Sequence, residues 1–254
     1  MIDRAFWISW YNLPEDRRND VLAWTHDVYI PRVLARPGVL WAAHYASETD
    51  FTPLGGGGRI SHKKNPEGVP TGDRYILMFG ATEAHAFVNP GPTDFHAGMS
   101  ESDRVMLGLR AGERTNIMLQ EARIDGPDSP RGTAGLLPGP AIQLGSFNAP
   151  SPADEEALAD WYARWRLPSL KDLPGCMRVR KLVSVAGWAK HACFYEFTSL
   201  QAREEHFVYY EKAQPEMVKW STAVVRDTVH APGSANIATR LFAALSEEAK
   251  RAER

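Results

Sequence analysis

Short runs of aromatic and β-branched residues alternate along the chain with stretches in which apolar residues recur every three or four positions. The first kind of run is typical of strands and the second of helices. Between residues 15 and 35, for example, Val21, Leu22, Trp24, Val28 and Tyr29 have helical spacing. The pattern of the first half predicts strands at 5–11, 39–45, 74–80 and 114–120, and helices at 15–35, 82–88 and 92–109.

The second half repeats this order after a stretch rich in glycine and proline. Its pattern predicts strands at 142–147, 177–185, 191–197 and 222–229, helices at 150–165 and 200–210, and a charged helix near the C-terminus. Each half then has the order β-α-β-β-α-β, which is ferredoxin-like. The sequence therefore predicts an α+β protein with a first unit at 1–125, a linker at 126–140 and a second unit at 141–254.

A repeated motif supports this division. Trp24 is followed seven residues later by Pro31 and six residues after that by Pro37-Gly38, and the same spacing starts at Trp161, 137 residues further on. Internal repeats of this kind determine the architecture. We interpret the chain as two fused copies of one unit, in which Pro31 interrupts the first helix.

The least regular region lies between residues 48 and 73 and contains Gly55-Gly56-Gly57-Gly58. A long loop within a compact unit is often a lid or a binding loop, and a surface hairpin tip is the alternative. The four glycines lack the following Gly-Lys-Ser/Thr and the strand-loop-helix context of a nucleotide site.

Composition narrows the function classes. The net charge of −2 does not indicate the positively charged surface that binds nucleic acid or an anionic membrane. No apolar run is long enough to span a bilayer, and no secretory signal is visible. Two cysteines cannot form a disulfide framework. We therefore expect a cytoplasmic protein that binds neither nucleic acid nor membranes.

The motif of the second half resembles the EthD-like branch of the dimeric α+β barrel superfamily. The matching residues are Trp161-Tyr162, Leu167-Pro168, Leu173-Pro174-Gly175, Tyr195-Glu196-Phe197 and Phe207, with looser matches at Trp24, Pro31 and Pro37-Gly38. The resemblance implies two ferredoxin-like sheets that pair face to face, by tandem duplication within this chain. It also implies a small-molecule function, since such proteins include cofactor-free monooxygenases, polyketide cyclases, isomerases and haem enzymes.

The chain departs from the pattern of this family at one position. The family often has a histidine two residues before the proline that follows the helix, whereas this chain has Tyr29 and Arg166 there. His26 lies one helical turn before Tyr29, which places it on a nearby face of the predicted helix.

Histidines are concentrated in the first half, which we therefore expect to be the active one. Histidine suits proton abstraction near neutral pH, and tyrosine can donate to a developing oxyanion. The predicted catalytic residues are His26, Tyr29, His44, His85 and His96. Aromatic side chains often line pockets for flat ligands, so Trp7, Trp10, Trp24, Trp41 and Tyr75 are predicted to bind substrate, together with Arg164 and Arg166. No metal site and no cofactor are expected, because no histidine pair has metal-ligand spacing.

Basic residues cluster around the second motif, at Arg164, Arg166, Arg178, Arg180 and Lys181. They could hold a carboxylate or phenolate through charge-assisted hydrogen bonds. The alternative, which we favour, is a solvated face paired with Asp160, Asp172 and Glu155.

These observations predict a cofactor-independent enzyme that acts on a small aromatic or polyketide-like molecule by His/Tyr acid–base catalysis, with a lyase, isomerase or cyclase type of reaction. A cofactor-free monooxygenase with a phenolic substrate is the first alternative. A non-catalytic ligand-binding protein is the second. A homodimer is a further expectation.

Overall fold

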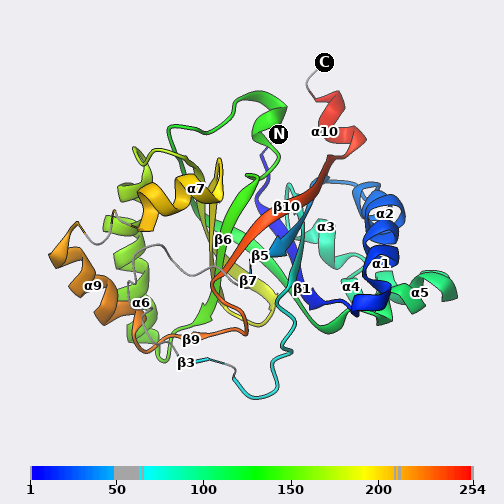
Figure 1. The fold of residues 1–254 in the computed structure, drawn as a ribbon, viewed down its shortest axis with the longest axis horizontal. Helices are drawn as coiled ribbons and strands as arrows, with labels where there is room; N and C mark the ends of the chain where they lie inside the picture. The colour runs from blue at the N-terminus through cyan, green and yellow to red at the C-terminus, as the bar shows by residue number, and fades with distance from the viewer. Residues whose placement is uncertain (1, 49–62, 65, 209, 211–212, 253–254) are drawn as a thin grey trace.

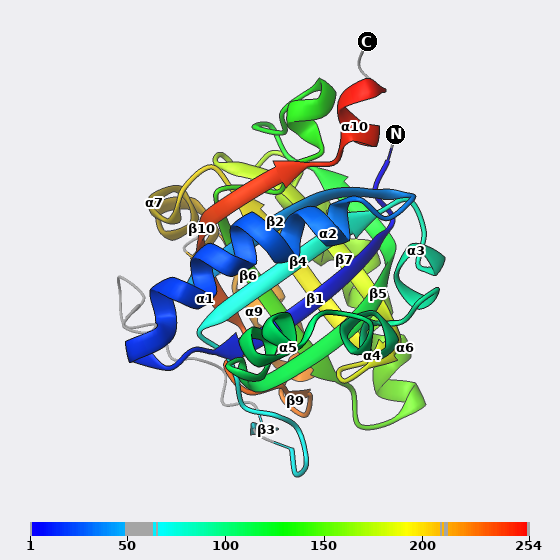
Figure 2. The same ribbon diagram turned by 90° about the vertical axis from the view of Figure 1, so that its right-hand side faces the viewer.

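Eight antiparallel strands close into a barrel that helices cover on the outside (Figures 1 and 2). The computed structural model describes residues 2–48, 63–64, 66–208, 210 and 213–252. This architecture is the α+β barrel that the family resemblance implied. The glycine loop at 55–58 lies outside the described residues.

The barrel strands follow one another around a closed ring. They are β1 (Ala5–Asn12), β2 (Val39–Ser47), β4 (Tyr75–Ala81), β5 (Ala111–Asp125), β6 (Ala141–Asn148), β7 (Cys176–Gly187), β8 (His191–Phe197) and β10 (Asn236–Leu245). Their order is β10-β2-β4-β1-β5-β7-β8-β6, and β6 pairs with β10 to close the ring. Two short strands, β9 (Val229–His230) and β3 (Lys63–Lys64), extend the sheet beyond β6.

Both halves of the barrel have the same strand order. If the strands of each half are numbered in chain order, the first half runs 2-3-1-4 as β2-β4-β1-β5. The second half also runs 2-3-1-4, as β7-β8-β6-β10. The fourth strand of each half pairs with the second strand of the other, through β5 with β7 and β10 with β2.

Helices of the first half lie on one side of the barrel and most helices of the second half on the other (Figure 1). The first group is η1 (Glu15–Arg17), α1 (Arg18–Trp24), η2 (Thr25–Tyr29), α2 (Ile30–Leu34), α3 (His85–Val88), α4 (Pro92–Ala97) and α5 (Glu101–Gly108). The later segments are η3 (Gly132–Gly135), α6 (Pro152–Trp161), η4 (Tyr162–Arg166), η5 (Pro168–Leu170), α7 (Leu200–Ala202), η6 (Arg203–Val208), α9 (Pro215–Val225) and α10 (Glu247–Arg251). None of these described helices is both long and apolar enough to cross a membrane.

The repeated motif starts with the same backbone conformation in both halves and then continues as the α-helix α2 in the first and as the 3-10 turn η5 in the second. A five-residue π-helical segment follows each tryptophan, and the proline comes two residues after that segment ends. The prediction that Pro31 interrupts the helix is wrong, because the chain stays helical to Leu34. Pro31 is accommodated in the first turn of α2, where a missing backbone N–H costs little.

Each motif ends at a glycine with a φ of +79°, Gly38 in the first half and Gly175 in the second. Only glycine adopts this left-handed conformation without strain. The amide of Gly38 donates to the carboxylate of Glu248 at 3.0 Å, and that of Gly175 donates to Asp128 at 2.8 Å. Each carboxylate follows the fourth strand of the opposite half, so the two halves contact each other reciprocally.

The prediction of a last strand at 222–229 is wrong. Residues 215–225 form α9, and the fourth strand of the second half is β10. The run Thr222-Ala223-Val224-Val225 has high β propensity, but tertiary packing overrides such a preference. In α9 the spacing of Met217, Trp220 and Val224 places their side chains against the second-half core.

Three hydrophobic clusters correspond to three layers. One fills the barrel interior and includes Phe6, Ile8 and Trp10. The second lies between the first-half sheet and its helices, and the third between the second-half sheet and its helices. This arrangement follows from strand alternation, since successive residues of a barrel strand point inward and outward.

Charged side chains occupy part of the barrel interior, which corrects a prediction. Arg178 and Arg180 are fully buried and form ion pairs with Glu196 at 3.0 and 3.1 Å, while Arg180 also pairs with Asp3. Lys181 is buried beside Glu121 and His191. The solvated face predicted for these three basic residues is therefore wrong. Arg178 and Arg180 point into the barrel, whereas Lys181, on the opposite face of β7, is buried beside Tyr162 in the layer between the sheet and the second-half helices.

Candidate functional site

Polar side chains form two hydrogen-bonded groups within the first-half layer. His26 Nε2 lies 2.8 Å from His44 Nδ1, and His44 Nε2 lies 2.8 Å from the Tyr11 hydroxyl. Tyr29 makes the second group through a 2.7 Å contact between its hydroxyl and His96 Nε2. Four of the five predicted catalytic residues thus fall into these two groups.

The buried guanidinium of Arg110 lies between the two groups. Its carbon atom is 4.7 Å from the ring centre of Tyr11 and 4.4 Å from that of Tyr29. Burial raises the pKa of both tyrosines, so both hydroxyls remain protonated near neutral pH. Arg110 and Tyr11 were not predicted as site residues, because their sequence positions do not show that folding brings them beside Tyr29 and His44.

Burial also lowers the pKa of the three histidines. The pKa of His44, which is fully buried, lies well below its usual value, and the neighbouring His26 and Arg110 lower it further. The pKa values of His26 and His96 are lowered mainly by burial. All three imidazoles are therefore neutral at neutral pH, and each offers one donor and one acceptor nitrogen.

The fifth predicted catalytic residue, His85, lies apart from these groups. Its side chain is exposed on α3. The predicted substrate-binding aromatics also do not converge, since Trp10 and Trp41 belong to the barrel interior. Trp24 donates to Asp103 at 2.9 Å, and Tyr75 stacks on Tyr11.

Trp7 explains why the first-half layer is closely packed. Its fully buried ring makes edge contacts with Tyr29, Phe87 and Phe95 and a tilted contact with Phe79. Trp7 therefore packs in the core of this layer, and its predicted substrate-binding role stays a prediction.

The corresponding layer of the second half contains a cavity of about 160 Å³. Rings and polar groups line it together: Gln143, Gly145, Phe147, Trp161, Tyr162, Arg166, Cys193, Tyr195, Ser221, Val225, Thr228, His230 and Ala235. A cavity of roughly 150 Å³ lined by apolar groups is large enough for a molecule such as benzene.

Smaller side chains on β6 account for this cavity. Trp7 is paired with Phe79 in the first-half sheet, and Gln143 is paired with Tyr195 in the second. Gln143 therefore takes the place that Trp7 occupies, and Gly145 takes the place of Ser9. The loss of an indole ring leaves space that the second half does not refill.

Arg166 brings a buried positive charge to the cavity. Its Nε donates to the Tyr195 hydroxyl at 3.0 Å, and its guanidinium carbon lies 4.7 Å from the ring centre of Phe207. Burial raises the pKa of Tyr195 and Tyr162, which stay neutral donors. The structure therefore places one of the two predicted arginines at a pocket.

Two buried donors of the cavity wall lack partners. Trp161 Nε1 and Ser221 Oγ have no hydrogen-bond partner among the described residues, although their side chains are only 4% and 7% exposed. A buried polar group without a partner is costly, and such groups often mark a site for water or a ligand. Ser221 was not predicted as a site residue, and the strand predicted directly after it, at 222–229, concealed the helix α9 to which it belongs.

The other predicted arginine, Arg164, lies outside the cavity. Its side chain is 72% exposed and pairs with Asp160 at 3.2 Å, as the solvated-face alternative predicted. His230 does line the cavity and was not predicted. Its ring stacks on Phe147, with centres 5.3 Å apart, and its Nδ1 lies 3.1 Å from the Ser234 hydroxyl.

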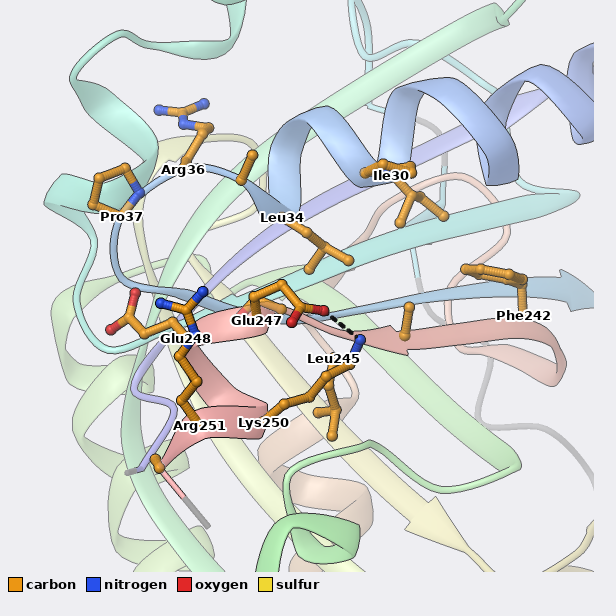
Figure 3. A pocket seen from close by; sticks show the side chains of 15 residues that line it. Ile30, Leu34, Arg36, Pro37, Phe242, Leu245, Glu247, Glu248, Lys250 and Arg251 are labelled. Carbon is orange, nitrogen blue, oxygen red and sulfur yellow. Dashed lines mark hydrogen bonds and ion pairs between the residues drawn. The ribbon is translucent and has the colours of Figure 1, made fainter. Parts of the chain in front are cut away.

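A second hollow lies on the first-half side, between α2, β10 and α10. It is a groove of about 940 Å³ in which Ile30 and Leu34 point from the helix toward β10 (Figure 3). Phe242 and Leu245 line the strand side, and charged residues of α10 form the rim. No group of three His, Cys, Asp or Glu side chains in the described part of the chain is arranged to hold a metal ion.

No family model and no curated protein matches the sequence. Solved structures with a similar fold include an anthrone oxidase-like protein, with a TM-score of 0.58 and 10% identity over 97% of this chain and 94% of that one. A candidate monooxygenase from Fusobacterium nucleatum subsp. nucleatum ATCC 25586 has a TM-score of 0.57 and 10% identity, over 96% of both chains. A candidate monooxygenase from Lactobacillus acidophilus NCFM has a TM-score of 0.55 and 12% identity, over 96% of this chain and 97% of that one. At these identities the likeness concerns the fold.

Proposed function

We propose that the protein is an enzyme that binds a small aromatic molecule as an anion in the second-half cavity. The observation that carries this proposal is the combination of a buried arginine with two unpartnered donors, Trp161 Nε1 and Ser221 Oγ, around one ring-sized space. A phenolate, enolate or carboxylate group would accept hydrogen bonds from Trp161 and Ser221 beside the positive charge of Arg166, and Phe147 and Tyr162 would flank its ring.

The proposed chemistry is stabilisation of a developing oxyanion. Preorganised donors in a site shielded from water stabilise such a charge more strongly than water does. His230 is the cavity residue best suited to take the proton from a phenol or from a carbon next to a carbonyl group. The pKa of Cys193 is raised by burial, so a thiolate nucleophile is not part of the proposal.

The proposal includes two alternative kinds of reaction of the bound anion. Return of the proton at another atom gives an isomerase reaction, departure of a leaving group with the electron pair of the anion gives a lyase reaction, and attack of the anion on a carbonyl carbon of the same molecule gives a cyclase reaction. Reaction of the anion with dioxygen gives a cofactor-free monooxygenase, which we favour because the similar folds include candidate monooxygenases and an anthrone oxidase-like protein. Turnover that stops when dissolved oxygen is removed supports the second kind, and turnover without oxygen supports the first.

We further propose that the chain arose by tandem duplication of an EthD-like, ferredoxin-like unit, with boundaries at 1–125 and 141–254. The shared 2-3-1-4 strand order and the two glycines at φ +79° support this origin. Because the barrel closes within one chain, the expected homodimer is not needed to complete it and stays a prediction.

Filling the cavity tests the binding site. Gly145→Val places side-chain atoms in the cavity, and a Cβ at this position meets its nearest neighbours at 3.8 and 3.9 Å, which is ordinary contact. We expect the affinity for 4-hydroxybenzoate, measured by calorimetry, to fall about tenfold or more, since a displaced ring loses most of its burial. The urea midpoint should change little.

Ala244→Phe is the matched control, because it fills the groove on the other side of the barrel. It should leave the affinity for 4-hydroxybenzoate unchanged. Equal affinity in wild type and Gly145→Val would reject the cavity as the site. Tight binding of phenols that are recovered unchanged after long incubation, with and without oxygen, would reject the enzymatic part and leave a binding protein.

A further inference from the structure

The hydrogen-bonded chain of the first half reaches the protein surface at His26. Its far end, Tyr11, and its middle member, His44, are fully buried, whereas His26 is partly exposed. Nε2 of His26 already makes the hydrogen bond with His44. Nδ1 is therefore the ring nitrogen of His26 that remains for a ligand.

His26 adjoins the groove between α2, β10 and α10. Its ring stacks on Phe242, with centres 4.6 Å apart and an angle of 10° between the planes, and Phe242 lines the groove. Ile30 lies one helical turn after His26 and also lines the groove. Through its contact with Phe242, the partly exposed end of the histidine chain therefore lies next to the apolar lining of the groove, in which Phe242, Ile30 and Leu34 are seen in Figure 3.

We propose that this groove is a second ligand site, in which His26 exchanges a proton with a flat, apolar molecule that carries an ionisable hydroxyl group. The volume of about 940 Å³ lies within the range of small-molecule pockets. The parallel stack of His26 on Phe242 favours a planar ligand, and the apolar lining from Ile30, Leu34 and Leu245 favours an uncharged ring system. This site is separate from the second-half cavity.

The proton transfer balances within the chain. The O–H bond of the ligand breaks, its electron pair stays on oxygen, and a new N–H bond forms at His26 Nδ1. The imidazolium keeps this proton and donates a hydrogen bond from Nε2 to His44 Nδ1, and His44 donates a hydrogen bond from its own Nε2 to the oxygen of the protonated Tyr11 hydroxyl. Reversal of these steps returns the proton to the ligand.

The charged and titratable groups around His26 favour a proton transfer that can be reversed. Burial lowers the pKa of His26, and the nearby Asp27 opposes this effect only in part. On the inner side, His44 is held neutral by burial, by His26 and by Arg110. A proton taken up at His26 is therefore readily released again.

The test uses 2-naphthol, because the excited state of this molecule is a strong acid and its emission distinguishes naphthol from naphtholate. We expect bound 2-naphthol to emit as naphtholate in the wild-type protein. His26→Gln keeps a polar side chain beside His44 but cannot accept the proton, so naphtholate emission should fall about tenfold while affinity changes little. His85→Gln, an exposed histidine of the same half, should behave as wild type.

Two cavity-filling variants locate the probe. Ala244→Phe should abolish the naphtholate emission, because this residue lines the groove, and Gly145→Val, which fills the other cavity, should leave that emission unchanged. The proposal is overturned if His26→Gln retains wild-type emission. It is also overturned if Gly145→Val abolishes the signal and Ala244→Phe does not, since the probe would then occupy the other cavity.

Discussion

Replacement of Arg166 by leucine is expected to lower the affinity for 4-nitrophenolate about thirtyfold, which corresponds to about 2 kcal/mol. The guanidinium is the buried positive charge of the cavity, and leucine keeps an apolar contact with Phe207 without the charge. The variant should also bind the neutral phenol in preference to the anion. Absorbance of bound 4-nitrophenol measures both effects, because only the anion is yellow.

Arg164→Leu is the matched control, two residues away on the same helical segment. Its side chain is largely exposed and paired with Asp160. Exposed ion pairs contribute little, so affinity should change less than about twofold. Equal losses in the two variants would mean that general positive charge, and not the Arg166 contact, binds the anion.

Replacement of Glu196 by leucine is expected to destabilise the fold by about 3–5 kcal/mol, because it leaves the buried charge of Arg178 without its carboxylate partner and removes one of the two carboxylates that pair with Arg180. Glu196 is fully buried, pairs with Arg178 and Arg180, and accepts from the amide of Gly139 at 2.9 Å. Urea denaturation measures the change in the free energy of unfolding.

The exposed pair of Glu216 with Lys219 supplies the control. Glu216→Leu should change the free energy of unfolding by less than about 1 kcal/mol. A similar small change in Glu196→Leu would show that the buried network does not stabilise the barrel.

The same network predicts a pH dependence. Burial by itself would raise the pKa of Asp3, but the charge and hydrogen bond of Arg180 and the hydrogen bond of Trp41 hold it below the ordinary value of 3.8. The ionised form is therefore favoured by folding. This contribution to stability is complete above about pH 3.8 and is lost as the pH falls through the lower pKa of the folded state.

The sequence predicted the barrel architecture well where local pattern and tertiary packing agree. The aromatic and β-branched runs at β1, β2, β4 and β8 became strands, and the motif at Trp24 and Trp161 marked equivalent turns. The proximity of His26 and His44 agrees with their shared assignment to one catalytic group, although the sequence did not show that they would be hydrogen-bonded.

The remaining features depend on packing that a single sequence does not reveal. The strand β10 is rich in alanine, so its pattern predicted no strand, whereas α9 is rich in residues with β propensity. The cavity arises from the difference between Trp7 and Gln143 at equivalent positions. That difference becomes visible only when the registers of the two sheets are known. Burial of Arg178 and Arg180 likewise depends on which strand face points inward.

A crystal structure after soaking with 4-hydroxybenzoate tests the central claim most directly. We expect the ring in the second-half cavity, with an anionic oxygen within hydrogen-bond distance of the Arg166 guanidinium and with Trp161 Nε1 or Ser221 Oγ donating to the ligand. A cavity that contains no ligand, with 4-hydroxybenzoate bound elsewhere on the protein, would contradict the assignment of this site.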